Sequence, residues 1–329
     1  MILKNCVGLI TGASQGLGKA FAESLLKKGA QVVICDINQA QGEITKAEFD
    51  LRYGPGRTTF ITCDVTSLPQ LKDVFIETVQ TFGRLDVLCN NAGINNENSW
   101  ERTISVNLVA LIQASYLALD HMRCDRGGKG GSIINVASMS GQWYFLTLLK
   151  RHTSCNLDHQ SNSIFSLLFV KSYCAQFDHH NHLESYCGQT SELCPQVQDF
   201  PISGNIFSTS TLSGFIPAAH APVYTASKHG VLGFTRSLAE ASSFGNYGVR
   251  INALCPSFVN TEILETINCE ENLGIFYQFK DNAKNLMQVF GVLEPSEIAK
   301  GFVQLLEDDS LNGAVMKITT SKGIHFENY

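Results

Sequence analysis

The sequence predicts an α/β protein with a doubly wound parallel sheet that is covered by helices on both faces. Short runs of continuous apolar residues alternate with longer segments whose apolar residues recur at helical spacing. A glycine-rich turn follows the first apolar run directly. The chain has 329 residues, 44% of them hydrophobic, which is enough to bury the core of such a sheet. These observations predict a single domain with one long irregular insertion.

The first half of the chain predicts strands and helices in strict alternation. Residues 7–10 and 31–35 are apolar runs typical of buried parallel strands. Between them, the spacing of Ala20, Phe21 and Leu25 predicts a helix over 20–28. The same two patterns continue to residue 138, with strands predicted at 59–65, 85–89 and 131–138 and helices at 39–51, 68–82 and 104–122.

The alternation stops at residue 142 and resumes near residue 223. Residues 142–214 are rich in Ser, His, Asn and Cys and show no sustained periodicity, so we expect this insertion to be disordered. A structureless loop of that length is uncommon in a compact domain. Its origin stays open: translated non-coding sequence, which the missing periodicity favours, an aberrant splice product, or a genuine lid. The single domain is therefore predicted to comprise 1–141 and 215–329, with helices at 226–243 and 295–306 and strands at 250–256 and 314–318.

The charge of the chain argues against several classes of partner. The net charge is −6, whereas binding to nucleic acid or to an anionic membrane requires a basic face. No apolar run approaches the ~20 residues of a membrane-spanning helix. The first residues lead directly into the glycine turn and lack the pattern of a secretory signal. We therefore expect a cytoplasmic protein with no membrane span.

The cysteines predict buried thiols in place of disulfides or a metal site. There are 11 of them, an odd number, and none forms a CxxC pair. The histidines and cysteines of the insertion match no common zinc spacing, so no metal is predicted. Small core residues are expected at the positions beside apolar runs, namely Cys6, Cys35, Cys63, Cys89 and Cys255.

The turn at 11–18 reads TGASQGLG and predicts a dinucleotide site of the Rossmann type. A strand, the glycine turn and a helix follow one another in the order that such a site requires. Glycines let the backbone approach a pyrophosphate, and the start of a helix offers free N–H groups and a positive dipole end. The candidate cofactor residues of this turn are Gly12, Gln15, Gly16, Leu17 and Gly18.

Residues after the second, third and fourth strands complete the predicted cofactor site. The carboxylate of Asp36 can accept hydrogen bonds from ribose hydroxyls and would repel the extra phosphate of NADP, so NAD is favoured. A helix cap or a solvated turn is the alternative role for this side chain. An adenine edge is expected beside the end of the third strand, and a nucleotide against the small residues of NNAG at 90–93. The candidate residues are Asp36, Ile37, Cys63, Asp64, Val65 and Asn91.

Tyr224 and Lys228 are the candidate catalytic pair. Residues four apart on a helix share a face, so both side chains can enter one cleft. A free phenol has a pKa near ~10. A nearby ammonium would bring the pKa of Tyr224 closer to neutral, as a general base requires. Ser138, at the end of the fifth strand, could bond the substrate oxygen. Asn107 alone reads as an ordinary polar helix residue.

These motifs resemble the short-chain dehydrogenase/reductase family over nearly the whole chain except the insertion. The matching features are the glycine turn, Asp36, the NNAG segment and YTASK at 224–228. The resemblance implies a proton relay of Asn107, Ser138, Tyr224 and Lys228. In that relay the tyrosine is the acid/base, the serine orients the substrate oxygen, the lysine holds the nicotinamide ribose and the asparagine holds a water. Val259, Asn260 and Thr261 match the loop that meets the carboxamide of the cofactor.

Segments outside the shared motifs resemble one branch of that family more closely. They are residues 82–108, 250–265 and 306–326. This resemblance implies oxidation of the 15-hydroxyl of prostaglandins and of related hydroxylated fatty acids to a ketone, and a homodimer formed by helix packing. Dehydrogenases for steroids or hydroxyacyl groups, or a silent NAD-binding protein blocked by the insertion, are the alternatives. Phe258 and Phe290 could line a lipid site or be plain core aromatics.

Three departures from the family pattern concern residues beside the site. Ser257 stands where a glycine usually follows Pro256, which could stiffen or shift the loop. Ala221 occupies the position where the prostaglandin-oxidising branch places a glutamine near the substrate. The insertion separates the serine and tyrosine, and its two ends read alike, so Ser210 is a second candidate for the role of Ser138.

Overall fold

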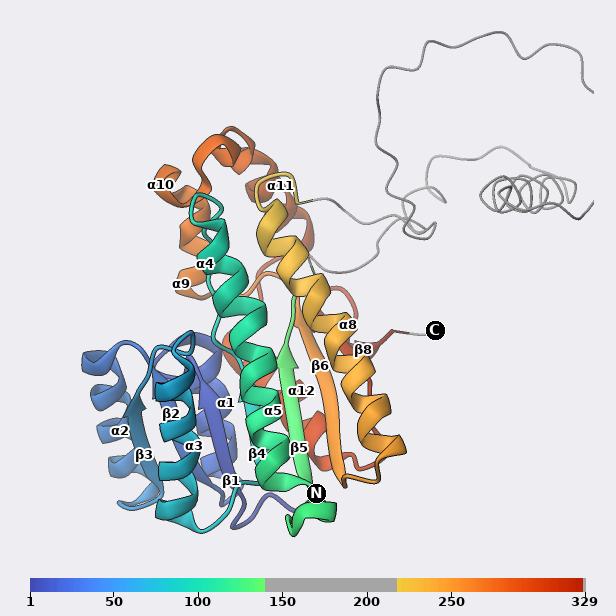
Figure 1. The fold of residues 1–329 in the computed structure, drawn as a ribbon. Coiled ribbons are helices and arrows are strands. Elements are labelled where there is room, and N and C mark those ends of the chain that lie inside the picture. The colour runs from blue at the N-terminus through green and yellow to red at the C-terminus, as the bar shows by residue number, and fades with distance from the viewer. Residues whose placement is uncertain (140–217, 328–329) are drawn as a thin grey trace, which may run out of the picture. The chain divides into compact units, whose positions relative to one another are not determined.

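The structure, a computed structural model, describes residues 1–139 and 218–327 (Figure 1). These residues form one eight-stranded sheet with the order β3-β2-β1-β4-β5-β6-β7-β8. Strands β1 to β7 are parallel, and β8 runs antiparallel to β7. The bounds are β1 Val7–Thr11, β2 Gln31–Asp36, β3 Thr58–Thr62, β4 Val87–Asn90, β5 Gly131–Val136, β6 Val249–Pro256, β7 Val315–Thr319 and β8 Gly323–Phe326.

Helices connect the parallel strands, because a chain that joins two parallel strands must return along the whole length of the sheet. A π-helical turn at Ser105–Val109 joins two of them into one continuous rod. The α-helices are α1 Gly16–Lys27, α2 Gln39–Tyr53, α3 Leu68–Phe82, α4 Trp100–Ile104, α5 Ala110–Met122, α8 Pro222–Phe244, α9 Glu262–Glu265, α10 Glu270–Leu273, α11 Lys280–Phe290 and α12 Pro295–Glu307, with 3-10 turns at Cys124–Arg126, Thr266–Asn268 and Gly274–Phe279.

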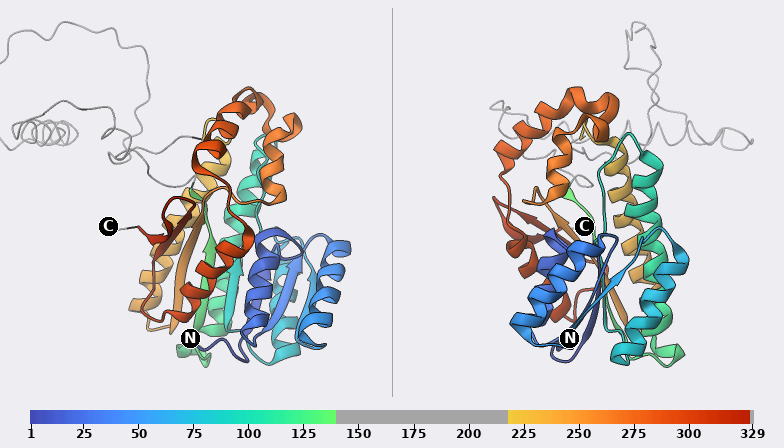
Figure 2. Two further views of the ribbon diagram at one scale, coloured as in Figure 1. Left: turned by 180° about the vertical axis from the view of Figure 1, so that it is seen from behind. Right: turned by 90° about the vertical axis from the view of Figure 1, so that its left-hand side faces the viewer.

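The sheet separates two hydrophobic cores. Helices α3, α5 and α8 cover one face, where Leu71 and Phe75 of α3 are fully buried (Figure 1). Helices α1 and α12 cover the other face (Figure 2), and the rings of Phe21 and Phe302 stack there at 4.6 Å between centroids. Because both faces are covered, the strands between them consist of continuous apolar residues and do not alternate.

The predicted fold is confirmed, and helix α3 has the bounds that the sequence predicts. Two parts were missed. Strand β8 is short and follows a tight turn after β7, and the segment from α9 to α11 breaks into helices too short to show a helical period. The insertion at 142–214 lies outside the described residues, so the division into one domain, 1–141 with 215–329, stays a prediction.

The parallel order brings distant segments to one edge of the sheet. The glycine turn follows β1, Asp36 ends β2, Ser138 lies two residues after β5, and the loop at 257–261 follows β6. The carboxyl ends of parallel strands meet at the same edge, and the reversal of strand order between β1 and β4 opens a crevice there. The short helices α9, α10 and α11 lie beyond this edge (Figure 1).

One helical rod among the described residues, Trp100–Met122, is long and apolar enough to cross a bilayer. Half of its apolar window is buried inside the protein. The buried side chains of α5, including Ala114 and Ala118, pack in the core beneath the sheet. The rod therefore has the features of a core helix. The five cysteines predicted as core residues, Cys6, Cys35, Cys63, Cys89 and Cys255, are all buried, which confirms that prediction.

A buried polar network joins the centre of the sheet to α5 and α8. The amide of Asn90 in β4 donates to the Ser115 hydroxyl (3.0 Å) and to the Oδ1 atom of Asn135 in β5 (2.9 Å). The amide of Asn135 in turn donates to the Thr235 hydroxyl of α8 (2.9 Å). All four residues are buried, so each lost partner would leave a polar group without water to replace it.

Replacing Asn135 with alanine should therefore weaken the fold. The substitution removes two hydrogen bonds and leaves Asn90 and Thr235 each short of one partner, so the free energy of unfolding should fall by roughly 2–3 kcal/mol. Urea unfolding of Asn135→Ala against the wild type measures this. Gln80→Ala, at an exposed position of α3, is the control and should change stability by no more than about 0.5 kcal/mol. Equal effects of the two substitutions would contradict the prediction.

Candidate active site

The glycine turn between β1 and α1 has a backbone that only glycine accommodates easily. Gly12 and Gly16 have φ values of 64° and 55°, in the left-handed region. A Cβ atom on Gly18 would lie 2.2 Å from the carbonyl oxygen of Gly12. The first turn of α1 carries no side-chain cap, which leaves its N–H groups available to an anion. The turn therefore has a backbone that suits a pyrophosphate, and binding of a pyrophosphate by these residues stays a prediction.

Asn91, which follows β4, is hydrogen-bonded to this turn. Its Nδ2 atom donates to the carbonyl oxygens of Thr11 (3.0 Å) and Gly12 (2.9 Å), and its backbone N–H donates to the Thr11 hydroxyl (3.1 Å). Asn91 was predicted to be a cofactor residue, in a segment where a nucleotide could lie against the backbone. The structure shows that its amide donors fix the shape of the glycine turn, and contact between Asn91 and a cofactor stays a prediction.

The carboxylate of Asp36 lies against the glycine turn. Its Oδ2 atom accepts hydrogen bonds from the Ser14 backbone N–H (3.0 Å) and hydroxyl (2.7 Å), and its Oδ1 atom accepts from the Asn38 N–H (3.0 Å). A carboxylate has further acceptor sites beyond these three bonds. Asp36 is half-buried and Ile37 beside it is exposed, so the remaining acceptor sites can reach a ribose at the mouth of the crevice.

The end of β3 borders a small hollow at the same edge. Val65, Asn90 and Ala92 are among the residues that line it, together with side chains of α5. Cys63, two residues before Val65, is buried. The Asp64 carboxylate accepts hydrogen bonds from the backbone N–H (2.9 Å) and hydroxyl (2.7 Å) of Thr66, which lower the pKa of that carboxyl. Recognition of adenine at 63–65 stays a prediction.

The loop after β6 closes against the glycine turn. A Cβ atom on Gly16 would lie 3.4 Å from the Cγ2 atom of Thr261, and the Gln15 amide contacts the carboxylate of Glu262. Val259 is buried, whereas Asn260 is exposed and bonds the Glu294 carboxylate at 3.2 Å. The predicted carboxamide loop thus lies beside the predicted pyrophosphate turn.

Tyr224 and Lys228 stand in the first two turns of α8, on one face, as predicted. The Tyr224 hydroxyl is hydrogen-bonded to the side chain of Ser138. The Lys228 ammonium is buried, donates to the carbonyl oxygen of Val136 (2.9 Å) and lies 5.6 Å from the centre of the Tyr224 ring. The structure therefore brings together the tyrosine, lysine and serine that the sequence singled out.

Burial is the main influence on the acidity of both groups. It raises the pKa of the Tyr224 phenol, and the hydrogen bond from Ser138 opposes that effect. Burial also lowers the pKa of the Lys228 ammonium to about 8. The sequence predicted that Lys228 would bring the pKa of Tyr224 down. The pKa of Tyr224 is raised overall, because the cost of removing a phenolate from water exceeds the stabilisation that the Ser138 hydrogen bond provides.

Asn107 lies in the π-helical turn between α4 and α5 and is buried. Its Oδ1 atom accepts from the Ile94 N–H (2.9 Å), and its Nδ2 atom donates to the Ile94 carbonyl (2.9 Å) and the Ser227 hydroxyl (3.1 Å). A Cβ atom on Gly93 would lie 3.4 Å from Asn107 Oδ1 and 3.6 Å from Lys228 Nζ. Both polar atoms thus border the same side of Gly93.

The sequence matches a known protein family. The family model described as short chain dehydrogenase matches residues 7–148 and 182–272, which include the segments of the candidate site. The chain belongs to the short-chain dehydrogenase family. The glycine turn, Ser138, Tyr224 and Lys228 all lie within the matched residues, and their roles in a reaction stay predictions.

Individual relatives cover nearly all of the chain or less than half of it. 15-Hydroxyprostaglandin dehydrogenase [NAD(+)] of Homo sapiens and that of Macaca fascicularis are each 42% identical over 323 residues, which covers 98% of this chain and 94% of theirs. L-fucose dehydrogenase of Bos taurus is 34% identical over 144 residues, covering 41% of this chain and 50% of its own.

Two solved short-chain dehydrogenase structures share the fold. Levodione reductase superposes with a TM-score of 0.62 at 23% identity, covering 97% of this chain and 98% of its own. A 3-ketoacyl-(acyl-carrier-protein) reductase from Brucella melitensis, complexed with NADH, superposes with a TM-score of 0.63 at 20% identity, covering 96% and 98%. At this level of identity the likeness supports the fold alone.

The structure does not place several of the predicted residues in contact with a substrate. Ala221 is buried at the N-cap of α8, and Phe258 and Phe290 are half-buried, so their contact with a substrate stays a prediction. Ser210 lies outside the described residues. Ser257 has no positive φ, and its N–H bonds the Ile318 carbonyl at 2.9 Å, so this position of the dehydrogenase fold does not require glycine.

Two buried residues beside Tyr224 were not singled out from the sequence as site residues. Cys255 at the end of β6 accepts a hydrogen bond from the Ser138 backbone, and burial raises the pKa of its thiol to about 12. Glu97, in the loop between β4 and α4, accepts two backbone hydrogen bonds from the start of α8. No local pattern marks either residue, because the contacts that define them join distant segments.

Replacing Lys228 with methionine should change how stability depends on pH. The pKa of the buried ammonium is about 8, below its ordinary 10.5, so the unfolded chain binds this proton more tightly than the folded chain between those values. Stability is therefore lost as the pH falls through this window. At about 1.4 kcal/mol per pH unit, the wild type should lose roughly 3 kcal/mol relative to Lys228→Met by pH 7.

Urea unfolding between pH 7 and pH 10.5 measures this difference. Lys300→Met, at an exposed position of α12, is the control and should follow the wild type at every pH. A constant difference between the wild type and Lys228→Met across the range would contradict the assigned burial of the ammonium.

Proposed function

We propose that this chain oxidises the 15-hydroxyl of prostaglandins and of related hydroxylated fatty acids to the ketone, with NAD as cofactor. The supporting observation is the cluster of Tyr224, Ser138 and Lys228 beside a dinucleotide turn, in a chain 42% identical to 15-hydroxyprostaglandin dehydrogenase [NAD(+)] over nearly its whole length. The cluster supplies the acid/base chemistry of a secondary-alcohol dehydrogenase, and the relatives indicate the substrate.

The residues around the crevice fit NAD. The glycine turn and the uncapped start of α1 would hold the pyrophosphate. Asp36 would accept bonds from the ribose hydroxyls, and its charge disfavours the additional phosphate of NADP. Thr261 and its neighbours would approach the nicotinamide end, because their loop lies over Gly16. When bound, NAD+ accepts a hydride from the carbinol carbon.

Side chains of the protein remove the proton from the substrate hydroxyl. Ser138 orients the substrate oxygen, and the Tyr224 phenolate takes the proton from it. The Lys228 ammonium is held toward the site by the Val136 carbonyl, and it is the positive charge that would have to offset the burial that raises the pKa of Tyr224. Asn107 and Lys228 border the space beside Gly93, where a relay water would connect the buried lysine to solvent.

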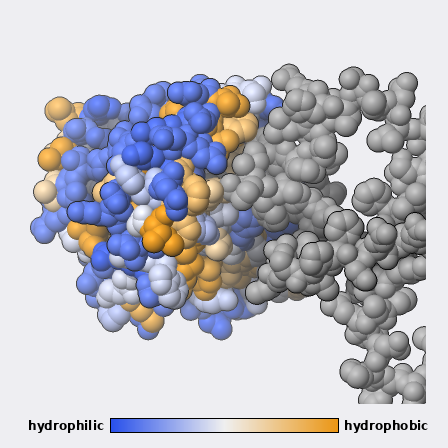
Figure 3. Space-filling view, turned by 90° about the horizontal axis from the view of Figure 1, so that it is seen from above, coloured by the Kyte–Doolittle hydropathy of each residue, from blue (hydrophilic) through white to orange (hydrophobic). Residues whose placement is uncertain are grey.

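A lipid substrate agrees with the side chains beyond the catalytic edge. In the segment from 274 to 292, Ile275, Phe279, Val289 and Val292 are exposed, with Ile275 and Val289 more than 70% exposed. Seen from this end of the described residues, apolar side chains lie among hydrophilic ones (Figure 3). Apolar surface beside a polar catalytic cluster suits a hydroxylated fatty acid chain. By resemblance, a homodimer and a cytoplasmic location also stay predictions.

Replacing Tyr224 with phenylalanine tests the assigned base. The substitution removes one hydroxyl and keeps the ring, so NADH binding should change by no more than about twofold while the rate of oxidation falls by roughly 10²–10⁴. NADH absorbance with a 15-hydroxy prostaglandin, a steroid and a hydroxyacyl substrate gives the rates and the substrate preference. NADH fluorescence gives the binding.

The matched control is Tyr116→Phe, at a half-exposed tyrosine of α5, which should retain full activity. A Tyr224→Phe variant that oxidises substrate at the wild-type rate would refute the assigned base. A wild type that turns over only a steroid or a hydroxyacyl substrate would refute the prostaglandin assignment.

Deletion of residues 142–214 tests whether the insertion is needed. The ends of β5 and α8 are joined directly by the Lys228–Val136 and Tyr224–Ser138 hydrogen bonds, so the domain should fold without it. NADH binding should persist, and turnover should be at least that of the full chain. If only the shortened chain turns over, the full chain is the silent NAD-binding form. Loss of binding and turnover together would place the insertion within the domain.

A further inference from the structure

The carboxylate of Glu97 occupies the start of the helix that carries Tyr224. Glu97 lies in the loop between β4 and α4 and is only 6% exposed. Its Oε2 atom accepts a hydrogen bond from the Val223 backbone N–H, and its Oε1 atom accepts one from the Tyr224 backbone N–H, both at 2.9 Å. Ionised acceptors make stronger hydrogen bonds than neutral ones, and negative charge is stabilised at a helix N-terminus.

Helix α8 has no cap of its own that could replace Glu97. The residue at the N-cap position is Ala221, whose side chain has no acceptor, and Pro222 after it has no N–H group. Val223 and Tyr224 therefore present the first backbone donors of the helix, and Glu97 binds both. The cap that most helices carry next to their first turn is supplied here from a distant loop.

Glu97 is itself held from the opposite side. Its backbone N–H donates to the Asn272 carbonyl oxygen (2.7 Å), as does the N–H of Asn98 (3.1 Å). The Asn96 amide donates to the side-chain oxygen of Asn272 (3.2 Å). Because Asn272 belongs to α10, the carboxylate is fixed between the short helices beyond the sheet edge and the first turn of α8.

Tyr224 is consequently fixed at both ends. Its backbone N–H is bonded to Glu97 and its hydroxyl to Ser138. We propose that Glu97 is a positioning residue, which sets the reach of the Tyr224 hydroxyl by anchoring the first turn of α8. This inference rests on the proposed function. A displacement of about 1 Å at a reacting group can reduce a rate by roughly 10²-fold, so the anchor would affect the chemical step.

The test is Glu97→Gln, which keeps the size of the side chain. A glutamine offers one acceptor oxygen, and its NH₂ group would face the second backbone N–H, so one of the two bonds is lost. We expect kcat per NADH-binding site to fall roughly 10- to 100-fold while the Kd for NADH changes by no more than about twofold. The isotope effect on kcat for a substrate deuterated at the carbinol carbon should rise, because hydride transfer becomes slower.

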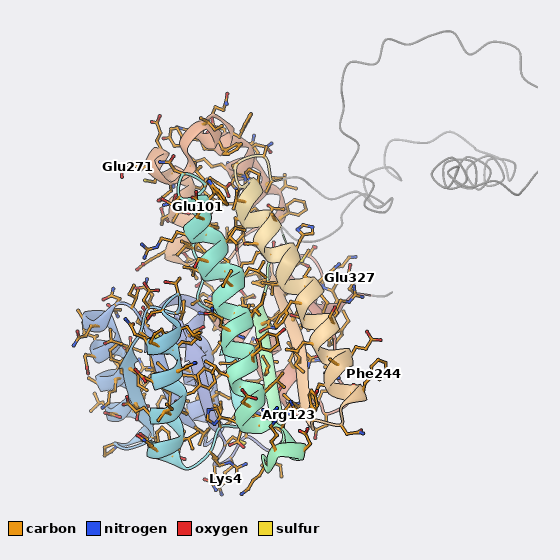
Figure 4. The ribbon with its side chains drawn as sticks, in the orientation of Figure 1. Lys4, Glu101, Arg123, Phe244, Glu271 and Glu327 are labelled. Atoms are coloured by element: carbon orange, nitrogen blue, oxygen red, sulfur yellow. The ribbon has the colours of Figure 1, made fainter. Side chains whose placement is uncertain are left out.

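The control is Glu101→Gln on α4, a nearby exposed acid (Figure 4), which should match the wild type in every measurement. Glu97→Asp retains the charge, and it should recover part of the lost kcat. A Glu97→Gln protein with the wild-type kcat and isotope effect per NADH-binding site, and only a lower melting temperature, would overturn the inference because the residue would then be merely structural.

Amide hydrogen exchange separates failure of this inference from failure of the proposed function. A wild type that binds NADH but oxidises none of the alcohols refutes the function, and exchange in the first turn of α8 then still tests the anchor. Exchange at Val223 and Tyr224 should be faster in Glu97→Gln and unchanged in Glu101→Gln. Equal protection of these amides in all three proteins would overturn the inference.

Discussion

The hydrogen bond from the Lys228 ammonium to the Val136 carbonyl is the interaction on which the active site depends. It joins the first turns of α8 to the end of β5, two segments that the insertion separates in the sequence. A buried ammonium is costly unless it has a partner, and this carbonyl is the partner that the sheet edge provides. Ser138 follows Val136 by two residues and is hydrogen-bonded to Tyr224. The Lys228–Val136 contact therefore also brings Ser138 and Tyr224 together.

The segment after β4 connects the cofactor half of the site with the catalytic half. Asn91 bonds the carbonyls of the glycine turn, Glu97 bonds the start of α8, and Asn107 bonds Ser227 of the same helix. Each contact uses a buried or half-buried polar side chain, and β4 adjoins β1 where the strand order reverses. The segment after β4 therefore bonds both the glycine turn and helix α8, and it holds these two parts of the site at a fixed distance from each other.

Features governed by near neighbours in the chain could be predicted from the sequence. The glycine turn could be found because its φ values and the close approach of Gly18 demand glycine at those positions. Tyr224 and Lys228 could be paired because a helix places residues four apart on one face. Asn107 became a candidate only through resemblance to a family, since a polar residue within a helix has no distinctive pattern. The short helices from α9 to α11 carry too few residues to show one.

The sequence by itself determined the doubly wound sheet, the glycine turn and the pairing of Tyr224 with Lys228 as candidate catalytic residues, because periodicity and backbone sterics act locally. Only the tertiary structure decided which polar groups support them. It showed that the Asn91 side chain bonds the carbonyls of the glycine turn, it placed Glu97 at the start of α8, and it gave the Tyr224 pKa an upward direction where the sequence predicted a downward one. Burial and the partners of a side chain arise from packing between distant segments, and a one-dimensional pattern does not contain that information.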